Sequence, residues 1–136
     1  IVVADVDGLK LVNDTKGHAA GDQLIQATAA ALMSIFRASD VVSRIGGDEF
    51  AVLLPHTDQE TAQDAVDRIK AVFESSKHGG GLSLGIATAN SGDELKATLK
   101  CADERMYQHK YSKRISAATQ FGVDKNKATN FATEKI

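Results

Sequence analysis

The chain has 136 residues, of which 43% are hydrophobic and 25% charged, so it can bury one core but is too short for two. Its 16 basic and 18 acidic residues give a net charge of −2, which argues against nucleic-acid binding through a broad positive field. Any anion is therefore expected to bind at a local site.

The first third of the chain is typical of a strand followed by a helix. Residues 1–6 form an apolar, β-branched run without a helical period, which predicts a strand buried on both faces that ends in Asp7-Gly8. From Gly21 onward, apolar residues recur at helical spacing and predict a helix of about four turns. Asp22, near the start of this helix, favours its dipole. The apolar stripe consists of Leu24, Thr28, Ala31, Leu32 and Ile35.

The middle of the chain indicates a hairpin and a second helix. Residues 41–45 and 50–54 are short apolar runs on either side of Gly46-Gly47-Asp48-Glu49, where the glycines suit a turn. A helical stripe follows, with Asp58 at the position expected for its cap. The stripe comprises Ala62, Ala65, Val66, Ile69, Val72 and Phe73, and the glycines at 79–81 then break the chain.

Another strand is predicted over residues 82–88, and a third helical stripe consists of Leu95, Leu99, Ala102 and Met106. The element order is therefore β, α, β, β, α, β, α. A hairpin between strand and helix units indicates an α/β fold of the α+β sandwich kind, with a mixed central sheet flanked by helices. This domain is expected to occupy residues 1–115, and residues 116–136 are expected to form a peripheral or mobile tail.

The single cysteine, Cys101, is expected to be a small core residue of a reduced, cytoplasmic protein. No apolar run approaches the ~20 residues that a membrane span requires, so no membrane contact is expected from this domain. The chain opens directly in its first strand, which suggests a fragment of a longer protein. A membrane anchor elsewhere in that protein is left open.

The predicted strand end and hairpin turn carry several carboxylates. Asp5 and Asp7 point to the same side of the first strand, and Asp48 would join them if the two strands are neighbours. Such a cluster needs a cation, and hard oxygen ligands suit Mg2+. Each feature alone is also common in ordinary loops. The neighbouring Gly8-Leu9-Lys10 offers amides and an ammonium for phosphate, and metal with phosphate indicates a nucleotide.

The sequence resembles the GGDEF family of diguanylate cyclases, whose signature stands at residues 46–50 as Gly-Gly-Asp-Glu-Phe. The resemblance covers residues 1 to about 115 and implies a ferredoxin-like core related to polymerase palm domains. The other matching motifs are Asp5-Val6-Asp7-Gly8-Leu9-Lys10, Val12-Asn13-Asp14, Gly17-His18, Gly21-Asp22, Arg44, Leu84-Gly85-Ile86-Ala87, Ala102-Asp103, Tyr107, Lys110 and Arg114.

The resemblance implies a role for each matching position. Mg2+, with Mn2+ as an alternative, would be bound by Asp5, the carbonyl of Val6, and Asp48. The residues implied to bind GTP are Gly8, Leu9, Lys10, Asn13, Asp22, Gly47, Lys110 and Arg114. Among them Asn13 and Asp22 would read the guanine edge, since a carboxylate accepts from its N1-H and N2-H2 donors. Without the resemblance, Asn13 would be interpreted as an ordinary loop residue and Asp22 as a charge that stabilises the start of a helix.

The implied reaction joins two GTP molecules into cyclic di-GMP, each 3′-hydroxyl attacking the other's α phosphorus. Asp48, Glu49 and Lys10 are the candidate catalytic residues, and which carboxylate acts as base stays open. A two-fold symmetric product suggests a homodimer of half-sites, controlled by a sensory or regulatory domain outside this chain.

A product-binding brake is also implied. Arg37 and Asp40 match the family's inhibitory RxxD motif, and Arg68 stands where some relatives supply another arginine. The alternative for all three is ordinary surface charge.

Two rival functions remain. The segment that precedes the first strand in relatives, with its Leu-Thr-Gly-Leu-x-Asn-Arg motif, is missing, Gly8 replaces a common aromatic, and Lys113 replaces a common glycine. A catalytically silent GGDEF domain that binds nucleotide is therefore one alternative, although its usual mark is a broken signature. The other is an adenylate-type cyclase, which Asp22 disfavours because adenine lacks donors at N1 and C2.

Overall fold

The computed structural model describes residues 1–75 and 81–120. Its elements, in chain order, are β1 (Val2–Val6), α1 (Leu9–Lys16), α2 (His18–Ile35), β2 (Val41–Arg44), β3 (Glu49–Leu53), α3 (Gln59–Ser75), β4 (Leu82–Ile86), the 3₁₀ turn η1 (Gly92–Glu94) and α4 (Leu95–Gln120). Within these residues the strands form one four-stranded sheet in the order β2-β3-β1-β4.

The α+β sandwich with a ferredoxin-like arrangement is confirmed, but the sheet is not mixed as the sequence had suggested. Each neighbouring pair, β2 with β3, β3 with β1 and β1 with β4, is antiparallel. The reason is that each helical crossover skips one strand. The parallel strands β1 and β2 are separated by β3, and the parallel strands β3 and β4 are separated by β1.

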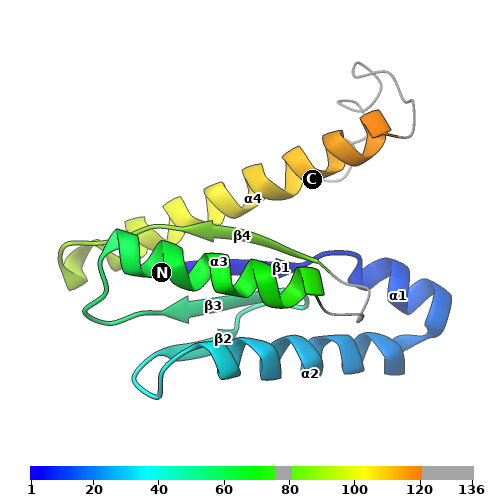
Figure 1. The fold of residues 1–136 in the computed structure, drawn as a ribbon, viewed down its shortest axis with the longest axis horizontal. Helices are drawn as coiled ribbons and strands as arrows, with labels where there is room; N and C mark the ends of the chain where they lie inside the picture. The colour runs from blue at the N-terminus through cyan, green and yellow to red at the C-terminus, as the bar shows by residue number, and fades with distance from the viewer. Residues whose placement is uncertain (76–80, 121–136) are drawn as a thin grey trace.

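The sheet has helices on both faces (Figure 1). Alternation along β1 sends Val2, Ala4 and Val6 into a large core with the apolar sides of α2 and α3. The intervening Val3 packs on the opposite face against Ala102 and Met106 of α4. Asp5 shares the face of Val3, so the fold directs this carboxylate toward α4.

The close packing of α4 on the sheet depends on Gly85 in β4. A Cβ atom there would lie 2.0 Å from the carbonyl oxygen of Ala102 and 2.2 Å from the backbone nitrogen of Met106. Because both atoms belong to the helix backbone, no side chain could move aside to make room. Gly85 therefore fixes how near α4 comes to β4.

Three side chains of α4 also bind the outer edge of β4. Arg105 donates to the carbonyl oxygen of Ile86 at 2.6 Å, and Lys113 donates to that of Leu82 at 2.8 Å. Between them, His109 Nδ1 accepts from the backbone N–H of Leu84 at 3.0 Å. Spacing of four residues on the helix thus matches spacing of two on the strand, and this three-residue edge ladder holds α4 in register.

Some of the predicted helices differ from the observed ones in where they begin or end. Helix α1 was not expected, and α2 begins at His18, so Asp22 lies one turn inside it. The cap predicted for α3 is confirmed, since Asp58 Oδ1 accepts from the N–H of Thr61 at 2.8 Å. Cys101 is half-buried beside the α4 core. Helix α4 continues to Gln120, and the rest of the expected tail, 121–136, lies outside the described residues.

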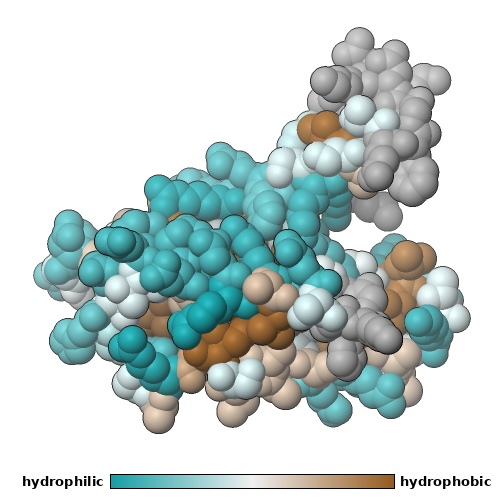
Figure 2. Space-filling view, viewed as in Figure 1, coloured by the Kyte–Doolittle hydropathy of each residue, from teal (hydrophilic) through white to brown (hydrophobic). Residues whose placement is uncertain are grey.

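The surface in Figure 2 is mostly polar, with an apolar band between α3 and α2. Several partly buried side chains pack against the large core, among them Ala29 and Ile35 of α2. Within residues 1–75 and 81–120, no helix has the length and apolar character needed to cross a bilayer.

Candidate functional site

The end of β1 is where the predicted carboxylates meet. Asp5 is only 3% exposed and lies opposite Glu49 of β3 and Ser83 of β4. The N–H of Val6 donates to the carbonyl oxygen of Asp48 at 2.8 Å, which holds the hairpin turn against β1. Because β1 and β3 are neighbours, the structure brings Asp5 and Asp48 together, as expected for that case.

Helix α4 brings two ammonium groups to this strand end. Lys110 Nζ lies 2.6 Å from both carboxylate oxygens of Asp5. Lys113 Nζ lies 2.7 Å from Asp7, whose other oxygen accepts from the Ser83 hydroxyl at 2.7 Å. Each aspartate at the end of β1 is thus paired with a lysine of α4.

The electrostatics of Asp5 reflect these surroundings. Burial raises the pKa of the Asp5 carboxyl above its ordinary value, and the hydrogen bond from Lys110 opposes that rise. The negative charges of Asp48 and Asp7 raise the pKa further. A buried carboxylate with acidic neighbours favours a bound cation, because a cation relieves both burial and repulsion.

The turn at residues 46–49 is held by a residue that the sequence gave no chemical role. The Arg44 guanidinium donates to the carbonyl oxygens of Gly46 at 3.1 Å and Gly47 at 2.7 Å. The N–H groups of Ile45 and Gly46 donate to the carbonyl oxygen of Glu49 at 2.9 and 3.3 Å. Arg44 is thus a positioning residue for Asp48, and an arginine just before a glycine pair is the signal that could have identified it.

The start of α1 supplies the predicted phosphate donors. Gly8 caps the helix in the left-handed region, with φ 79°, where glycine is strongly favoured. Glycine has no side chain, so this cap residue makes no side-chain hydrogen bond to the first turn. The amides of Gly8 and Leu9 lie at the cap and the first residue of α1, and the N–H groups and dipole of a helix start attract anions. The Lys10 side chain is exposed beside them.

The predicted guanine residues lie where α1 meets α2. A Cβ atom on Gly21 would lie 1.8 Å from Asn13 Oδ1, so the glycine lets the amide rest directly on α2. Asn13 Oδ1 is buried and has no hydrogen-bond partner within the described part of the chain. Asp22, the next residue along α2, is exposed. An unsatisfied buried acceptor beside an exposed carboxylate suits a ligand that carries donors.

Arg114 lies one helical turn beyond Lys110 on α4 and is exposed, so the two cations share a side of the helix.

The predicted inhibitory residues lie elsewhere. Arg37 and Asp40 form a turn in which Asp40 Oδ2 accepts from the Arg37 N–H at 2.8 Å. This turn precedes β2 and the Gly46–Glu49 turn follows it, so the strand separates them by roughly 13 Å. Arg68 is exposed on α3.

The donors expected to hold Mg2+ at the end of β1 are oxygen atoms, which this ion prefers, but only two of them belong to carboxylates. Within residues 1–75 and 81–120, no group of three or more His, Cys, Asp or Glu side chains is placed to hold a metal. The expected set needs only Asp5, Asp48 and the carbonyl of Val6, which are hard oxygen donors. Lys110 already brings a positive charge to both oxygens of Asp5.

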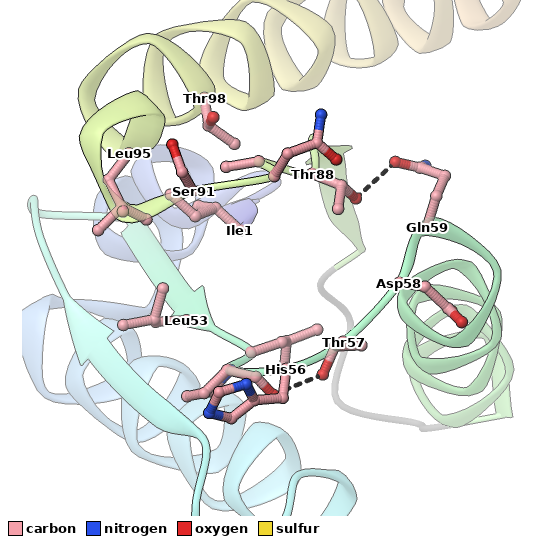
Figure 3. Close-up of a pocket in the computed structure, with 15 residues that line it drawn as sticks. Ile1, Leu53, His56, Thr57, Asp58, Gln59, Thr88, Ser91, Leu95 and Thr98 are labelled. Carbon is pink, nitrogen blue, oxygen red and sulfur yellow. Dashed lines mark hydrogen bonds between the residues drawn. The ribbon is translucent and has the colours of Figure 1, made fainter.

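The large pocket in Figure 3 belongs to the other end of the sheet. It measures about 900 Å³ and lies among Ile1, Leu53 and Thr88, next to η1 and the start of α3. The Thr88 hydroxyl donates to Gln59 Oε1 across one side at 2.7 Å. Among the described lining residues, none is a predicted site residue, so this pocket is separate from the site at the end of β1.

The fold and the site together define a ferredoxin-like domain in which two aspartates and two lysines gather at the end of β1. The family model described as "Diguanylate cyclase, GGDEF domain" matches residues 1–116. The chain therefore belongs to the GGDEF domain family of diguanylate cyclases.

Individual relatives agree with this assignment. The chain is 37% identical over 118 residues to the probable diguanylate cyclase DgcE of Escherichia coli, covering 81% of this chain and 11% of the relative. It is 39% identical over 123 residues to the response regulator PleD of Caulobacter vibrioides, covering 83% and 27%. The chain spans between about a tenth and a third of the curated relatives it matches.

Among solved structures, the GGDEF domain of PA1120 (YfiN or TpbB) from Pseudomonas aeruginosa is similar, with a TM-score of 0.74 and 36% identity. The match covers 82% of this chain and 74% of that one. The ferredoxin-like arrangement expected from the sequence is thus shared with a solved member of the family.

Proposed function

We propose that this domain condenses two molecules of GTP into cyclic di-GMP, with release of two pyrophosphates. The observation that carries the proposal is the meeting of Asp5 and Asp48 at the end of β1, with Lys110 beside them. The start of α1 adds amide donors to the same end of the sheet. Carboxylates for a cation and cations for phosphates are what phosphoryl transfer from a nucleoside triphosphate requires.

Residues of this chain would hold the substrate at three points. The amides of Gly8 and Leu9, with the Lys10 ammonium, would bind the β and γ phosphates at the start of α1. Lys110 and Arg114 would bind phosphate oxygens from α4. Gly47 lies at the glycine turn, where bare backbone can approach the nucleotide closely.

Asn13 and Asp22 would bind the guanine edge. The buried Asn13 Oδ1 gains a donor from the base, and the Asp22 carboxylate accepts from N1-H and N2-H2. This donor pattern favours guanine over adenine, and it makes GTP rather than ATP the proposed substrate.

Asp5, Asp48 and the Val6 carbonyl would hold Mg2+ or Mn2+. The bound ion would polarise phosphate oxygens and neutralise charge that develops on them. In each half-reaction a 3′-oxygen bonds to the α phosphorus, the bond from that phosphorus to the bridging oxygen breaks, and pyrophosphate leaves. Asp48 or Glu49 would accept the proton from the 3′-hydroxyl, since both belong to the turn that Arg44 and β1 hold.

The active unit proposed is a homodimer, because each copy would present one GTP and the product has two-fold symmetry. A sensory or regulatory domain in the full-length protein would control whether two copies face each other. Arg37 and Asp40, with Arg68, would bind cyclic di-GMP away from the substrate and act as a brake. The distance along β2 supports a site separate from the catalytic turn.

The experiment is incubation of the protein with GTP and Mg2+, followed by identification of the nucleotide product by mass spectrometry. ATP in place of GTP serves as the control for base choice. Formation of cyclic di-GMP from GTP alone supports the proposal. Binding of GTP without any product, in a chain dimerised through an added coiled coil, would assign the protein to the alternative, a catalytically silent GGDEF module.

A further inference from the structure

Lys110 occupies both oxygens of the carboxylate that the proposed metal needs. Its Nζ atom lies 2.6 Å from Asp5 Oδ1 and 2.6 Å from Asp5 Oδ2. The Asp5 side chain is 5% exposed and that of Lys110 is 21% exposed, so water screens this pair poorly. The attraction between these two charges is therefore screened less than that of an exposed ion pair on the surface.

A divalent ion and the Lys110 ammonium cannot both bind Asp5 in this way. A cation on either oxygen would lie within a few ångströms of Nζ, and like charges at about 4 Å repel strongly away from bulk water. The metal must therefore displace the lysine from at least one oxygen. A displaced ammonium that stays half-buried needs another anion.

Helix α4 is built so that the side chain can move without the helix. The edge ladder of Arg105, His109 and Lys113 fixes the backbone on β4 on both sides of Lys110. Lys113 also has its own carboxylate partner in Asp7. A lysine has four rotatable bonds, so its ammonium can leave Asp5 while the register of α4 is kept.

We propose that Lys110 is an internal counter-ion of Asp5 that is exchanged for the metal and then binds the triphosphate. Metal binding at Asp5 releases the Lys110 ammonium, and the phosphates of the nucleotide then bind that ammonium. Each ligand therefore favours binding of the other. The two ligands consequently bind with positive coupling, and the metal enters best together with the nucleotide. This inference rests on the metal site in the proposed function.

The test is a titration with Mn2+ at pH 8, in which free Mn2+ is measured by electron paramagnetic resonance. The 136-residue chain is used with and without 3′-deoxyguanosine triphosphate, which lacks the attacking hydroxyl, and the Mn2+ bound by the same nucleotide without protein is subtracted. The variants are Lys110→Gln, which removes the counter-ion, and Lys110→Arg, which retains a cation able to reach a carboxylate. Lys113→Gln is the matched control, since it removes an equal positive charge, that of the lysine paired with Asp7.

In the wild type, nucleotide should tighten Mn2+ binding about tenfold or more. Lys110→Gln should bind Mn2+ about tenfold more tightly than the wild type without nucleotide, and should gain less than the wild type when nucleotide is added. Lys110→Arg should resemble the wild type. Lys113→Gln should change nucleotide-free binding about twofold at most, because its lysine does not touch Asp5.

Equal nucleotide-free affinities in the wild type and Lys110→Gln would overturn the exchange while leaving the proposed function intact. An equal increase of nucleotide-free Mn2+ affinity in Lys110→Gln and Lys113→Gln would also overturn the exchange. The effect would then come from the loss of any nearby positive charge and not from the contact with Asp5. Failure of the wild type to bind Mn2+ even with nucleotide would contradict the metal site itself. The two failures are therefore distinguishable.

Discussion

Gly85 and Ala102 lie so close that a Cβ atom on the glycine would stand 2.0 Å from the alanine's carbonyl oxygen. This contact sets the height of α4 above β4. It also sets the position of Lys110, which reaches Asp5 from two turns further along the same helix. A backbone contact in the core thus determines where a proposed phosphate ligand lies.

Gly85→Ala should lower the free energy of unfolding by about 3 kcal/mol, because α4 must move off the sheet to make room. Urea unfolding followed by circular dichroism measures this loss. Gly92→Ala is the control, since a Cβ atom there meets nothing within 4 Å, and it should stay within about 0.5 kcal/mol of the wild type. Similar losses in both variants would contradict the packing argument.

Gly21→Ala should weaken GTP binding about tenfold or more, because the new methyl group displaces Asn13 from its place on α2. Helix stability should not fall for intrinsic reasons, since alanine is the better helix former. Nucleotide affinity is measured by calorimetry for Gly21→Ala, Asn13→Ala and the double variant. If the glycine acts through Asn13, the double variant should lose no more than either single one, whereas multiplied losses would show independent roles.

His109 should make stability depend on pH. Burial, and then the charge of Lys113, lowers the pKa of this imidazole, with Lys70 adding to the effect and Asp7 opposing it. The unfolded chain therefore binds more protons than the folded one below its ordinary pKa of 6.5, so stability falls as the pH drops through and below that value. Protonation also turns the Nδ1 acceptor of the Leu84 N–H into a donor.

Thermal unfolding of the wild type and His109→Gln between pH 8 and pH 5.5 checks this. Glutamine keeps an oxygen acceptor for the Leu84 N–H but does not titrate in this range. The melting temperature of the wild type should fall more steeply toward pH 5.5 than that of the variant. Parallel profiles would mean that His109 does not contribute to the pH dependence.

Arg37→Ala should relieve product inhibition while the initial rate stays close to that of the wild type. The turn should survive, because Asp40 accepts from the backbone N–H of residue 37 rather than from its guanidinium. The expected result is an about tenfold higher concentration of cyclic di-GMP for half-inhibition, measured in a dimerised chain. Lys100→Ala, which removes an exposed cation of α4, is the control. Equal sensitivity in the wild type and Arg37→Ala would make Arg37 an ordinary surface charge.

The sequence predicted those parts of the fold that local patterns encode. The β-branched run before Asp7 and the glycine pair at residues 46 and 47 both lie where expected, and Asp58 caps α3. Helix α1 was missed because none of its residues is fully buried and its cap is Gly8, which carries no side-chain signal. Antiparallel pairing throughout the sheet depends on which strands the crossovers skip, and no local pattern records that.

At the candidate site, too, the residues could be predicted from local motifs, whereas the contacts between distant segments could not. The matching motifs indicated the residues, and the structure brings Asp5, Asp48 and Lys110 to one end of the sheet. The edge ladder could not be predicted, because it joins side chains of α4 to backbone atoms of β4 about 20 to 30 residues away. The pairing of Lys110 with Asp5 likewise spans 105 positions of the chain.

The central claim is that the end of β1 and the Gly46–Glu49 turn form a metal-dependent centre that makes cyclic di-GMP. The most direct measurement is the initial rate of cyclic di-GMP formation from GTP, at several Mg2+ concentrations, in a dimerised wild type and in Asp48→Ala. Asp48 lies in a turn rather than the core, so the variant should keep its far-ultraviolet circular dichroism spectrum. The account predicts product from the wild type and a rate at least about a hundredfold lower from Asp48→Ala at every Mg2+ concentration. Equal rates in the two proteins would contradict it.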